Sequence, residues 1–168
     1  MSKKGTDEVR HGLKLVSPAF DQGEMIPSEY TCDGSNMSPP LEISGVPAGT
    51  KSLVLICDDP DAPMPALALL TFVHWVYYNI PPEVSSLDKN IGHDEHPAAG
   101  GIQGKNGYRK VGYGGPCPPF GTHRYFFRLY ALDTLLDLPP GAKKKQVLKA
   151  MKGHIITQTE LMGTYKKR

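Results

Sequence analysis

The sequence predicts a mainly β protein, an antiparallel sandwich with one or two short helices, one of them near the carboxyl terminus. Its 18 glycines and 16 prolines make up about a fifth of the 168 residues, against roughly 12% in average proteins, and this excess favours many turns over a helix bundle. Three segments rich in apolar, aromatic and β-branched residues are typical of strands, and one helical pattern follows late in the chain.

The first of these segments is the apolar run Ser52 to Cys57. It stops at Asp58-Asp59-Pro60, which predicts a strand that is buried on both faces and leads directly into a turn. The segments Thr71 to Ile80 and His123 to Leu132 are rich in aromatic and β-branched residues, and the former ends at two prolines. These two segments are the second and third predicted strands.

Alternation along a strand predicts which side chains share a face. The predicted core faces are Phe72, His74, Val76 and Tyr78 on the second strand and His123, Tyr125, Phe127 and Leu129 on the third. Each of the two strands therefore carries a histidine on a face otherwise made of core residues. The third strand sends His123 and Tyr125 to one face and Arg124 to the other, so these three side chains cannot all contact one ligand.

A glycine-rich stretch, Gly92 to Gly115, precedes the third strand and contains eight glycines in 24 residues. Connections of this length without secondary structure are uncommon in compact domains and are usually functional or mobile. A short strand near Tyr108 to Tyr113 is compatible with the pattern, but periodicity does not decide the matter.

The one convincing helix runs from Ala142 to Met151. Its apolar residues recur at helical spacing, and Gly153 is placed to end it. The tail from Ile155 to Tyr165 is either a closing strand or a helical turn.

The whole chain is expected to form one domain, residues 1–168. Its mass of 18.4 kDa lies within the usual range of a single domain. No internal repeat, linker or domain boundary is visible. We expect the core to span about residues 13–165 and residues 1–12 to be flexible.

Charge and composition exclude several classes of protein. The net charge is only +2, and lysines gathered around residues 143–152 and at the chain end are typical of a solvated surface, so no nucleic-acid partner is expected. The first fifteen residues lack the apolar stretch of a signal peptide, and the longest apolar run, Ala66 to Val73, is too short to span a membrane. Three cysteines without a CxxC spacing fit a reducing interior. These features predict a cytoplasmic protein.

Three segments combine polar groups with a rigid backbone. Asp59-Pro-Asp-Ala-Pro63 holds two carboxylates on a turn stiffened by proline, which reduces the freedom lost on binding. In Gly114 to Pro119 the glycines allow a ligand to approach the backbone and the prolines stiffen the rim. His123-Arg-Tyr125 then opens the third strand. Imidazole and tyrosine hydroxyl groups supply donors for phosphate oxygens, and a nearby carboxylate favours the charged imidazole.

Three segments in this order carry a family resemblance: Asp59-Pro-Asp-Ala-Pro63, Val73-His-Trp-Val-Tyr-Tyr-Asn-Ile-Pro81 and Gly114-Gly-Pro-Cys-Pro-Pro-Phe-Gly-Thr-His-Arg-Tyr125. They resemble the phosphatidylethanolamine-binding protein family, and specifically its bacterial and archaeal Raf-kinase-inhibitor-like branch. Gly153-His-Ile and Glu160-Leu-Met-Gly-Thr-Tyr165 are also similar to the carboxyl end of that branch. The resemblance covers the chain from about Leu13 to Tyr165.

This resemblance implies a Greek-key sandwich of two antiparallel sheets with a small anion pocket that accepts phosphate-like groups, with no cofactor, metal or catalytic residue. It implies the following ligand-binding residues: Asp59, Asp61, His74, His123 and Tyr125, with Gly115 and Pro116 at the rim. Arg124 is expected to form a structural salt bridge with a carboxylate. The resemblance also implies a homodimer, and it leaves the regulation of a protein partner such as a kinase open as a second role.

Two other classes of function stay open. A small hydrolase could use His74, His123 and Asp61 as acid and base, or Cys117 as a nucleophile beside His123. A protein-interaction scaffold could keep the fold with a vestigial pocket. His93-Asp-Glu-His96 contains metal-ligand residue types, but in a glycine-rich loop it is expected to be solvated surface.

Prolines and an unusual connector set the expectations for the pocket mouth. Met64 to Thr71 is longer and more apolar than the connector that the resemblance implies, so we expect the mouth to be reshaped on that side. The sequence does not decide which X-Pro bonds are cis, and Ala62-Pro63 and Gly115 to Pro119 are the candidate positions.

Overall fold

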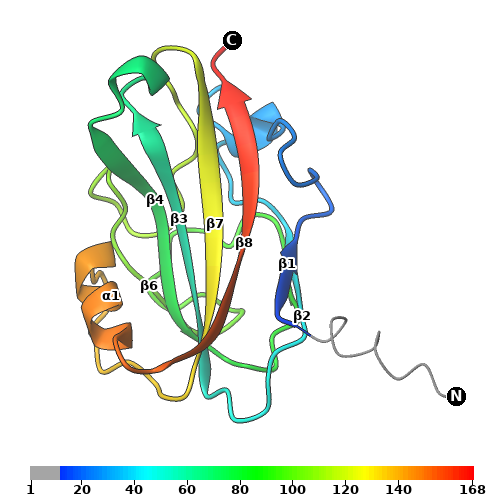
Figure 1. Ribbon diagram of the computed structural model, residues 1–168, viewed down its shortest axis with the longest axis vertical. Helices are drawn as coiled ribbons and strands as arrows, with labels where there is room; N and C mark the ends of the chain where they lie inside the picture. The colour runs from blue at the N-terminus through cyan, green and yellow to red at the C-terminus, as the bar shows by residue number, and fades with distance from the viewer. Residues whose placement is uncertain (1–11) are drawn as a thin grey trace, which may run out of the picture.

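The protein is built from two antiparallel sheets and one α-helix, as a computed structural model of the chain shows (Figure 1). The structure describes residues 12–168, so the expectation of a flexible stretch over residues 1–12 falls almost wholly outside the described residues. The elements are β1 (Lys14–Val16), β2 (Leu41–Ser44), β3 (Ser52–Ala62), β4 (Leu70–Ile80), β5 (Ser86–Leu87), β6 (Ile102–Gln103), β7 (Thr122–Leu132), α1 (Lys144–Met151) and β8 (Ile155–Lys166). Short 3₁₀ turns lie at Ser28–Tyr30 and Pro65–Leu67.

The larger sheet has the strand order β6-β4-β3-β7-β8, and the smaller has the order β1-β2-β5. β3 lies between its hairpin partner β4 and the much later β7, so the chain crosses over between them. The predicted fold class, a mainly β sandwich with a helix near the carboxyl terminus, is confirmed. Among residues 12–168, none of the helices has the length and apolar character needed to traverse a lipid bilayer.

Most predicted elements are confirmed, with three differences. The first strand continues to Ala62 instead of ending before Asp58, because β7 pairs with it as far as Asp58 and β4 as far as Ala62. The undecided tail is a strand, β8, paired with β7 along its length. Residues 108–113 form no strand, and the short strand of the glycine-rich stretch is β6 instead.

Ala62–Pro63 is the only cis peptide bond among the described residues. It is one of the two candidate positions, and Gly115 to Pro119 contains none.

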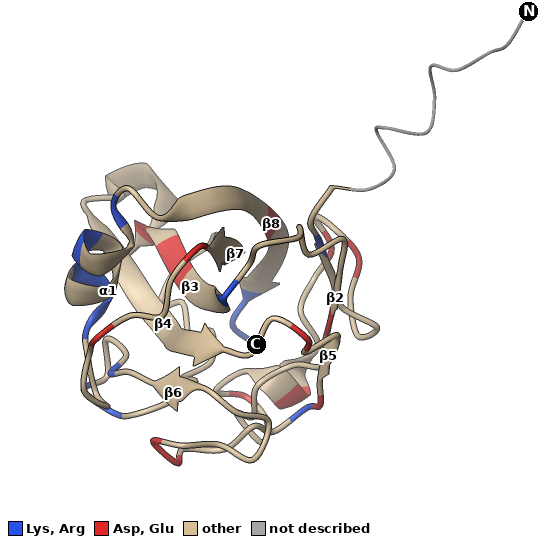
Figure 2. Ribbon diagram, turned by 90° about the horizontal axis from the view of Figure 1, so that it is seen from below, with Lys and Arg blue, Asp and Glu red and all other residues tan. Residues whose placement is uncertain are grey.

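Two hydrophobic cores lie on opposite sides of the larger sheet. One fills the space between the sheets and includes Leu55 of β3 and Trp75 of β4. The other lies under α1 and includes Ile56 of β3 and Val147 of α1. Figures 1 and 2 show the larger sheet between α1 and the strands of the smaller sheet. Both faces of β3 are therefore buried, as its continuous apolar run predicts.

A register shift between β3 and β4 falls at His74. Cys57 pairs with Trp75, and the next residue of β3, Asp58, already pairs with Val73. His74 is therefore the extra residue of a β-bulge, which bends the strand and interrupts its alternation. The prediction that one face of the second strand runs unbroken from Phe72 to Tyr78 is wrong for this reason.

The bulge moves one end of β4 to the opposite face. Beyond it, Phe72 pairs with Asp59 and shares the face between the sheets, while Val73 joins the core under α1. On β7 the predicted alternation is confirmed, since His123 and Tyr125 are buried and Arg124 is exposed. Side chains from three neighbouring strands consequently meet at one end of the space between the sheets.

Gln103 anchors the glycine-rich stretch to the sheet. Its side chain is fully buried, and its Oε1 atom accepts a hydrogen bond from the Trp75 indole nitrogen at 2.8 Å. Its Nε2 atom donates to the carbonyl oxygens of Gly92 and Asp94. A loop that sequence alone marks as long is therefore held by a single amide group at several points.

We expect the substitution Gln103→Leu to lower the free energy of unfolding by about 3 kcal/mol, because it leaves the indole N–H and two carbonyl groups without partners. Urea denaturation followed by circular dichroism measures this loss. The matched control is Gln158→Leu on β8, an exposed glutamine whose replacement should change stability by less than about 0.5 kcal/mol. Equal stability of the two variants would contradict the anchoring role.

Candidate functional site

A cavity of about 260 Å³ lies where the inner faces of β3, β4 and β7 end. Its polar residues come from all three strands, and the rest of its wall is largely apolar. The residues that line it are Asp59, Ala62, Pro63, Leu70, Phe72, His74, Tyr108, Cys117, Pro118, Pro119, His123 and Tyr125. Four of the seven residues that the sequence assigned to a ligand site therefore share one cavity.

Asp59 and His123 form a buried pair at the base of this site. The Asp59 carboxylate lies 2.6 Å from Nδ1 of His123, and both side chains are almost fully buried. The other carboxylate oxygen accepts the backbone N–H of Asp61 at 2.7 Å. On the far side of the imidazole ring, Nε2 donates to the carbonyl oxygen of Phe120 at 2.9 Å. Asp59 thus orients the ring, and both ring nitrogens are occupied by groups of the protein.

His74 lies in the same cavity in a different electrostatic environment. Its Nδ1 atom donates to the carbonyl oxygen of Gly114 at 2.6 Å. Burial lowers the pKa of His74 to about 4, against the raising effect of the Gly114 hydrogen bond and of Asp59. At neutral pH the ring is therefore uncharged. Because Nδ1 carries the proton, Nε2 is a hydrogen-bond acceptor, and no group of residues 12–168 donates a hydrogen bond to it.

The hydroxyl group of Tyr125 is the one buried side-chain polar atom of the described residues without a hydrogen-bond partner. Its ring centroid lies 5.2 Å from that of His74 and 6.4 Å from that of His123. Burial, followed by the charge of Asp59, raises the pKa of this phenol well above its ordinary value. The hydroxyl therefore keeps its proton, and it is a donor without an acceptor.

Asp61 and Arg124 form a salt bridge outside the cavity. Arg124 donates from Nε and Nη2 to the two carboxylate oxygens of Asp61, each at 2.9 Å, and its backbone N–H donates to the same carboxylate. The Arg124 hydrogen bonds hold the pKa of Asp61 below its ordinary value. The register is irregular between Asp59 and Ala62, and Asp61 does not line the cavity. The acid-base set of the hydrolase hypothesis is therefore not assembled.

Gly115 and Pro116 also lie off the cavity wall. The Gly115 N–H donates to Oδ1 of Asn36 at 2.8 Å, and a Cβ atom there would lie 2.5 Å from the carbonyl oxygen of Tyr30. The Pro116 carbonyl accepts the N–H of Cys32. Close packing against residues 30–36 thus requires a glycine at this position. The rim of the cavity is formed by residues 117–119.

Two aromatic residues of the wall were not among the predicted site residues. Phe72 and Tyr108 pack with ring centroids 4.7 Å apart, and Phe72 lies 4.9 Å from His74. The Tyr108 hydroxyl donates to the Gly115 carbonyl at 3.1 Å. Phe72 could have been predicted, because it lies two residues from His74 on the same strand. Tyr108 reaches the cavity from the glycine-rich loop, and no local sequence pattern predicts the position of that loop.

The connector between β3 and β4 contributes Pro63 to the cavity wall, and β4 contributes Leu70. Leu67 and Leu69 of the connector are 56% and 80% exposed, and Phe120, on the segment before β7, is 61% exposed.

Cys32 and Cys117, which are 85 positions apart in the sequence, form a disulfide bond with Cα atoms 5.4 Å apart. The expectation of unpaired cysteines in a reducing interior is wrong for these two, because the chain brings residues 30–36 against the proline-rich segment. Cys57 is free and buried. Since the Cys117 sulfur is bonded to another sulfur, it supplies no thiolate, and the proposed cysteine nucleophile is corrected as well.

The described residues contain no group of three or more histidine, cysteine or acidic side chains arranged to hold a metal ion. His93, of the predicted surface motif, is exposed, and its Nδ1 atom donates to the Val111 carbonyl at 2.8 Å.

Comparison with known proteins places this geometry in a family. The family model described as phosphatidylethanolamine-binding protein matches residues 16–166. The chain belongs to the phosphatidylethanolamine-binding protein family. A protein of Methanothermobacter thermautotrophicus named UPF0098 protein is 52% identical over 155 residues, which are 92% of this chain and 99% of that protein.

Two solved structures share the fold. A putative phosphatidylethanolamine-binding protein homologue, CT736 of Chlamydia trachomatis, superposes with a TM-score of 0.85 at 44% identity and covers 94% of this chain and 99% of its own. E. coli YbcL, described as a new member of the mammalian family, gives a TM-score of 0.81 at 30% identity and covers 93% and 99%. Membership of the phosphatidylethanolamine-binding protein family supports a binding-type function.

The neutral state of His74 predicts a loss of stability in acid. The folded protein resists the proton that the unfolded ring takes up near pH 6.5, so stability falls as the pH drops from about 6.5 towards 4. Between pH 7 and pH 5 the wild type should lose about 2 kcal/mol more free energy of unfolding than His74→Gln. Urea denaturation at both pH values measures the difference.

The matched control for this experiment is His96→Gln, which removes an exposed imidazole and should keep the pH dependence of the wild type. If His74→Gln shows the same pH dependence as the wild type, the ring is not held neutral by burial.

Proposed function

We propose that the cavity between β3, β4 and β7 binds a small phosphate-bearing or otherwise anionic group and that the protein acts as a binding module. The observation that carries the proposal is the buried, unpartnered hydroxyl group of Tyr125 in a cavity that His74 also lines. Buried polar groups in folded proteins are nearly always hydrogen-bonded, so an unpaired donor in a cavity indicates a partner that enters from outside.

Tyr125 is the direct donor for a ligand oxygen. Its hydroxyl cannot ionise at neutral pH, and a charged acceptor would form a stronger bond with it than a neutral one. Because the surrounding wall is buried, such a bond would be little screened by water.

His74 couples binding to a proton. The uncharged ring can accept a hydrogen bond from a protonated phosphate oxygen through Nε2. Alternatively, a fully ionised phosphate beside the ring would favour the imidazolium, so that a proton is taken up as the ligand binds. Both routes make binding tighter as the pH falls towards 6.

The Asp59–His123 pair removes the obvious obstacle to an anion. The Asp59 carboxylate would repel a phosphate, but it already accepts hydrogen bonds from His123 and from the backbone of Asp61. The Nε2 donor of His123 faces the Phe120 carbonyl, which occupies the place that a ligand oxygen would take. If residues 118–121 shifted, a ligand oxygen would replace the Phe120 carbonyl oxygen as the acceptor for His123 Nε2.

The apolar part of the wall suits the organic portion of a phosphate ester. Leu70, Phe72 and the rim prolines line the cavity, and Leu67 and Leu69, close to Leu70 in the chain, are exposed. A ligand with a charged head and an apolar substituent, similar to a phospholipid head group, would match both regions.

Regulation of a protein kinase and a homodimeric state rest on the family resemblance alone. A cytoplasmic location rests on the sequence features described above. The disulfide also removes the support that cysteine usage gave to a reducing compartment.

The test is calorimetric titration with butyl phosphate. We expect Tyr125→Phe to weaken binding by about tenfold or more, because the variant loses one hydrogen bond to a charged acceptor and little packing. Tyr125→Phe is a cleaner probe than His123→Ala, which would leave the buried Asp59 carboxylate without its partner.

The control is Tyr130→Phe on the same strand, which lies outside the cavity and should keep the wild-type affinity. Wild-type affinity in Tyr125→Phe, or no binding by the wild type at millimolar ligand, would overturn the proposal.

A further inference from the structure

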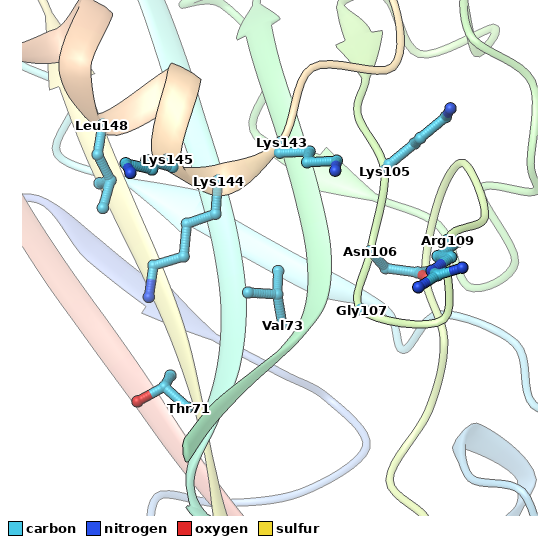
Figure 3. A pocket seen from close by; sticks show the side chains of 10 residues that line it. All are labelled: Thr71, Val73, Lys105, Asn106, Gly107, Arg109, Lys143, Lys144, Lys145 and Leu148. Carbon is cyan, nitrogen blue, oxygen red and sulfur yellow. The ribbon is translucent and has the colours of Figure 1, made fainter. Parts of the chain in front are cut away.

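A second, larger cavity lies on the other side of the central sheet. It has a volume of about 580 Å³ and is open between the first turn of α1 and the loop of residues 105–109, with Val73 of β4 between them (Figure 3). It shares no lining residue with the pocket described above. Half of its ten lining residues are cationic and none is acidic: Lys105, Arg109, Lys143, Lys144 and Lys145. We call this cavity the basic groove.

Most of the positive charge in the basic groove is uncompensated. Lys144 lies 2.6 Å from the Asp58 carboxylate, which also pairs with Arg128. The other four cations of the groove form no ion pair with a carboxylate of residues 12–168. The whole chain carries a net charge of only +2, so the groove concentrates charge locally. Figure 2 shows the corresponding basic ribbon segments on α1 and the acidic ones on the neighbouring β3.

The lysines stand at the end of the helix where positive charge is least favourable. Lys144 and Lys145 open α1, and its first turn contains no acidic residue. The amino end of a helix carries partial positive charge, so sequences usually place acidic side chains there. Sequences depart from such local preferences mainly at functional sites. An anion in the groove would relieve the repulsion among the lysines.

The two walls of the groove are fixed to each other by backbone contacts. The Lys105 N–H donates to the Ala142 carbonyl at 3.1 Å, directly before the helix. A Cβ atom at Gly104 would lie 2.1 Å from the same carbonyl oxygen, so only glycine permits this approach. The Gly107 N–H donates to the Val73 carbonyl at 2.7 Å. The backbone that carries the cations is therefore held in place before any ligand arrives, which reduces the entropic cost of binding.

We propose that the basic groove binds a small molecule with two or three linked phosphoryl groups. Figure 3 shows Lys143 extending toward the 105–109 loop and Lys144 extending toward Thr71, while Lys105 extends away from the helix. Linked phosphates can meet several of these charges at once, and the fork of Arg109 suits two phosphate oxygens.

The size and the remaining wall of the groove agree with this class of ligand. Its volume lies within the roughly 300–1,000 Å³ of small-molecule sites. No aromatic side chain lines it, whereas single-stranded nucleic acids require aromatic platforms for their bases. Val73 and Leu148 offer apolar contact for an organic substituent on the phosphate chain. A nucleotide and an inorganic oligophosphate both contain the linked phosphoryl groups that the groove would bind.

The test is calorimetric titration of the full chain with sodium tripolyphosphate. We expect the double variant Lys143→Gln/Lys145→Gln to bind about a hundredfold more weakly than the wild type, about tenfold for each lost charged contact. The matched control is Lys149→Gln/Lys152→Gln, which removes the same charge from the same end of the chain outside the groove and should change affinity by less than about threefold. Thermal melting of each variant confirms that it is folded.

Parallel titrations identify the ligand. Equal affinity for ATP and tripolyphosphate supports recognition of the phosphate chain alone, and tighter binding of ATP supports added contact with Val73 and Leu148. Inorganic phosphate binding as tightly as tripolyphosphate would overturn the requirement for linked groups. A glutamate-rich peptide binding equally well would overturn the small-molecule proposal in favour of an acidic protein segment.

Three further outcomes contradict the site itself: no binding of tripolyphosphate by the wild type, equal losses in the lysine variant and its control, or loss in Tyr125→Phe with none in the lysine variant. The last result would place the ligand in the first pocket, so the two sites are tested independently.

Discussion

The polar pocket exists because β4 carries one residue more than β3 where the two strands pair beside Cys57. Without this extra residue, alternation would turn His74 toward α1 and into an apolar core. With it, the inner face continues beyond Trp75 through His74 and Phe72, alongside Asp59 and Tyr125 of the neighbouring strands. Bulges of this kind re-aim side chains at functional sites, and here the bulge determines which polar groups meet.

The three acidic residues that end β3 have three different environments. Asp59 points inward and is hydrogen-bonded to His123, whereas Asp58 points to the opposite face and meets Arg128 and Lys144. Asp61 lies within the next irregularity of the register, is buried, and pairs with the half-exposed Arg124. Buried carboxylates are costly without such partners. One strand therefore supports both the polar pocket and the wall of the basic groove, and every carboxylate near either cavity is paired.

The sequence could predict those parts of the site that follow from alternation on an unbroken strand. His123 and Tyr125 are such a pair, and their common face was predicted correctly. The bulge at His74 has no local signature, so the face of His74 was predicted wrongly even though family resemblance named the residue. The Cys32–Cys117 bond and the approach of Lys105 to the start of α1 join segments far apart in the chain, and only tertiary packing decides which of them meet.

Burial holds His74 uncharged, and the hydrogen bond to the Gly114 carbonyl keeps its proton on Nδ1 and leaves Nε2 as an acceptor. Nitrogen-15 NMR of histidine-labelled protein reports the two ring nitrogens of His74 separately, with His74→Gln identifying its signals. We expect one protonated and one bare nitrogen at pH 7, unchanged down to about pH 5. Protons on both nitrogens of His74 at pH 7, or a single proton on Nε2, would contradict it.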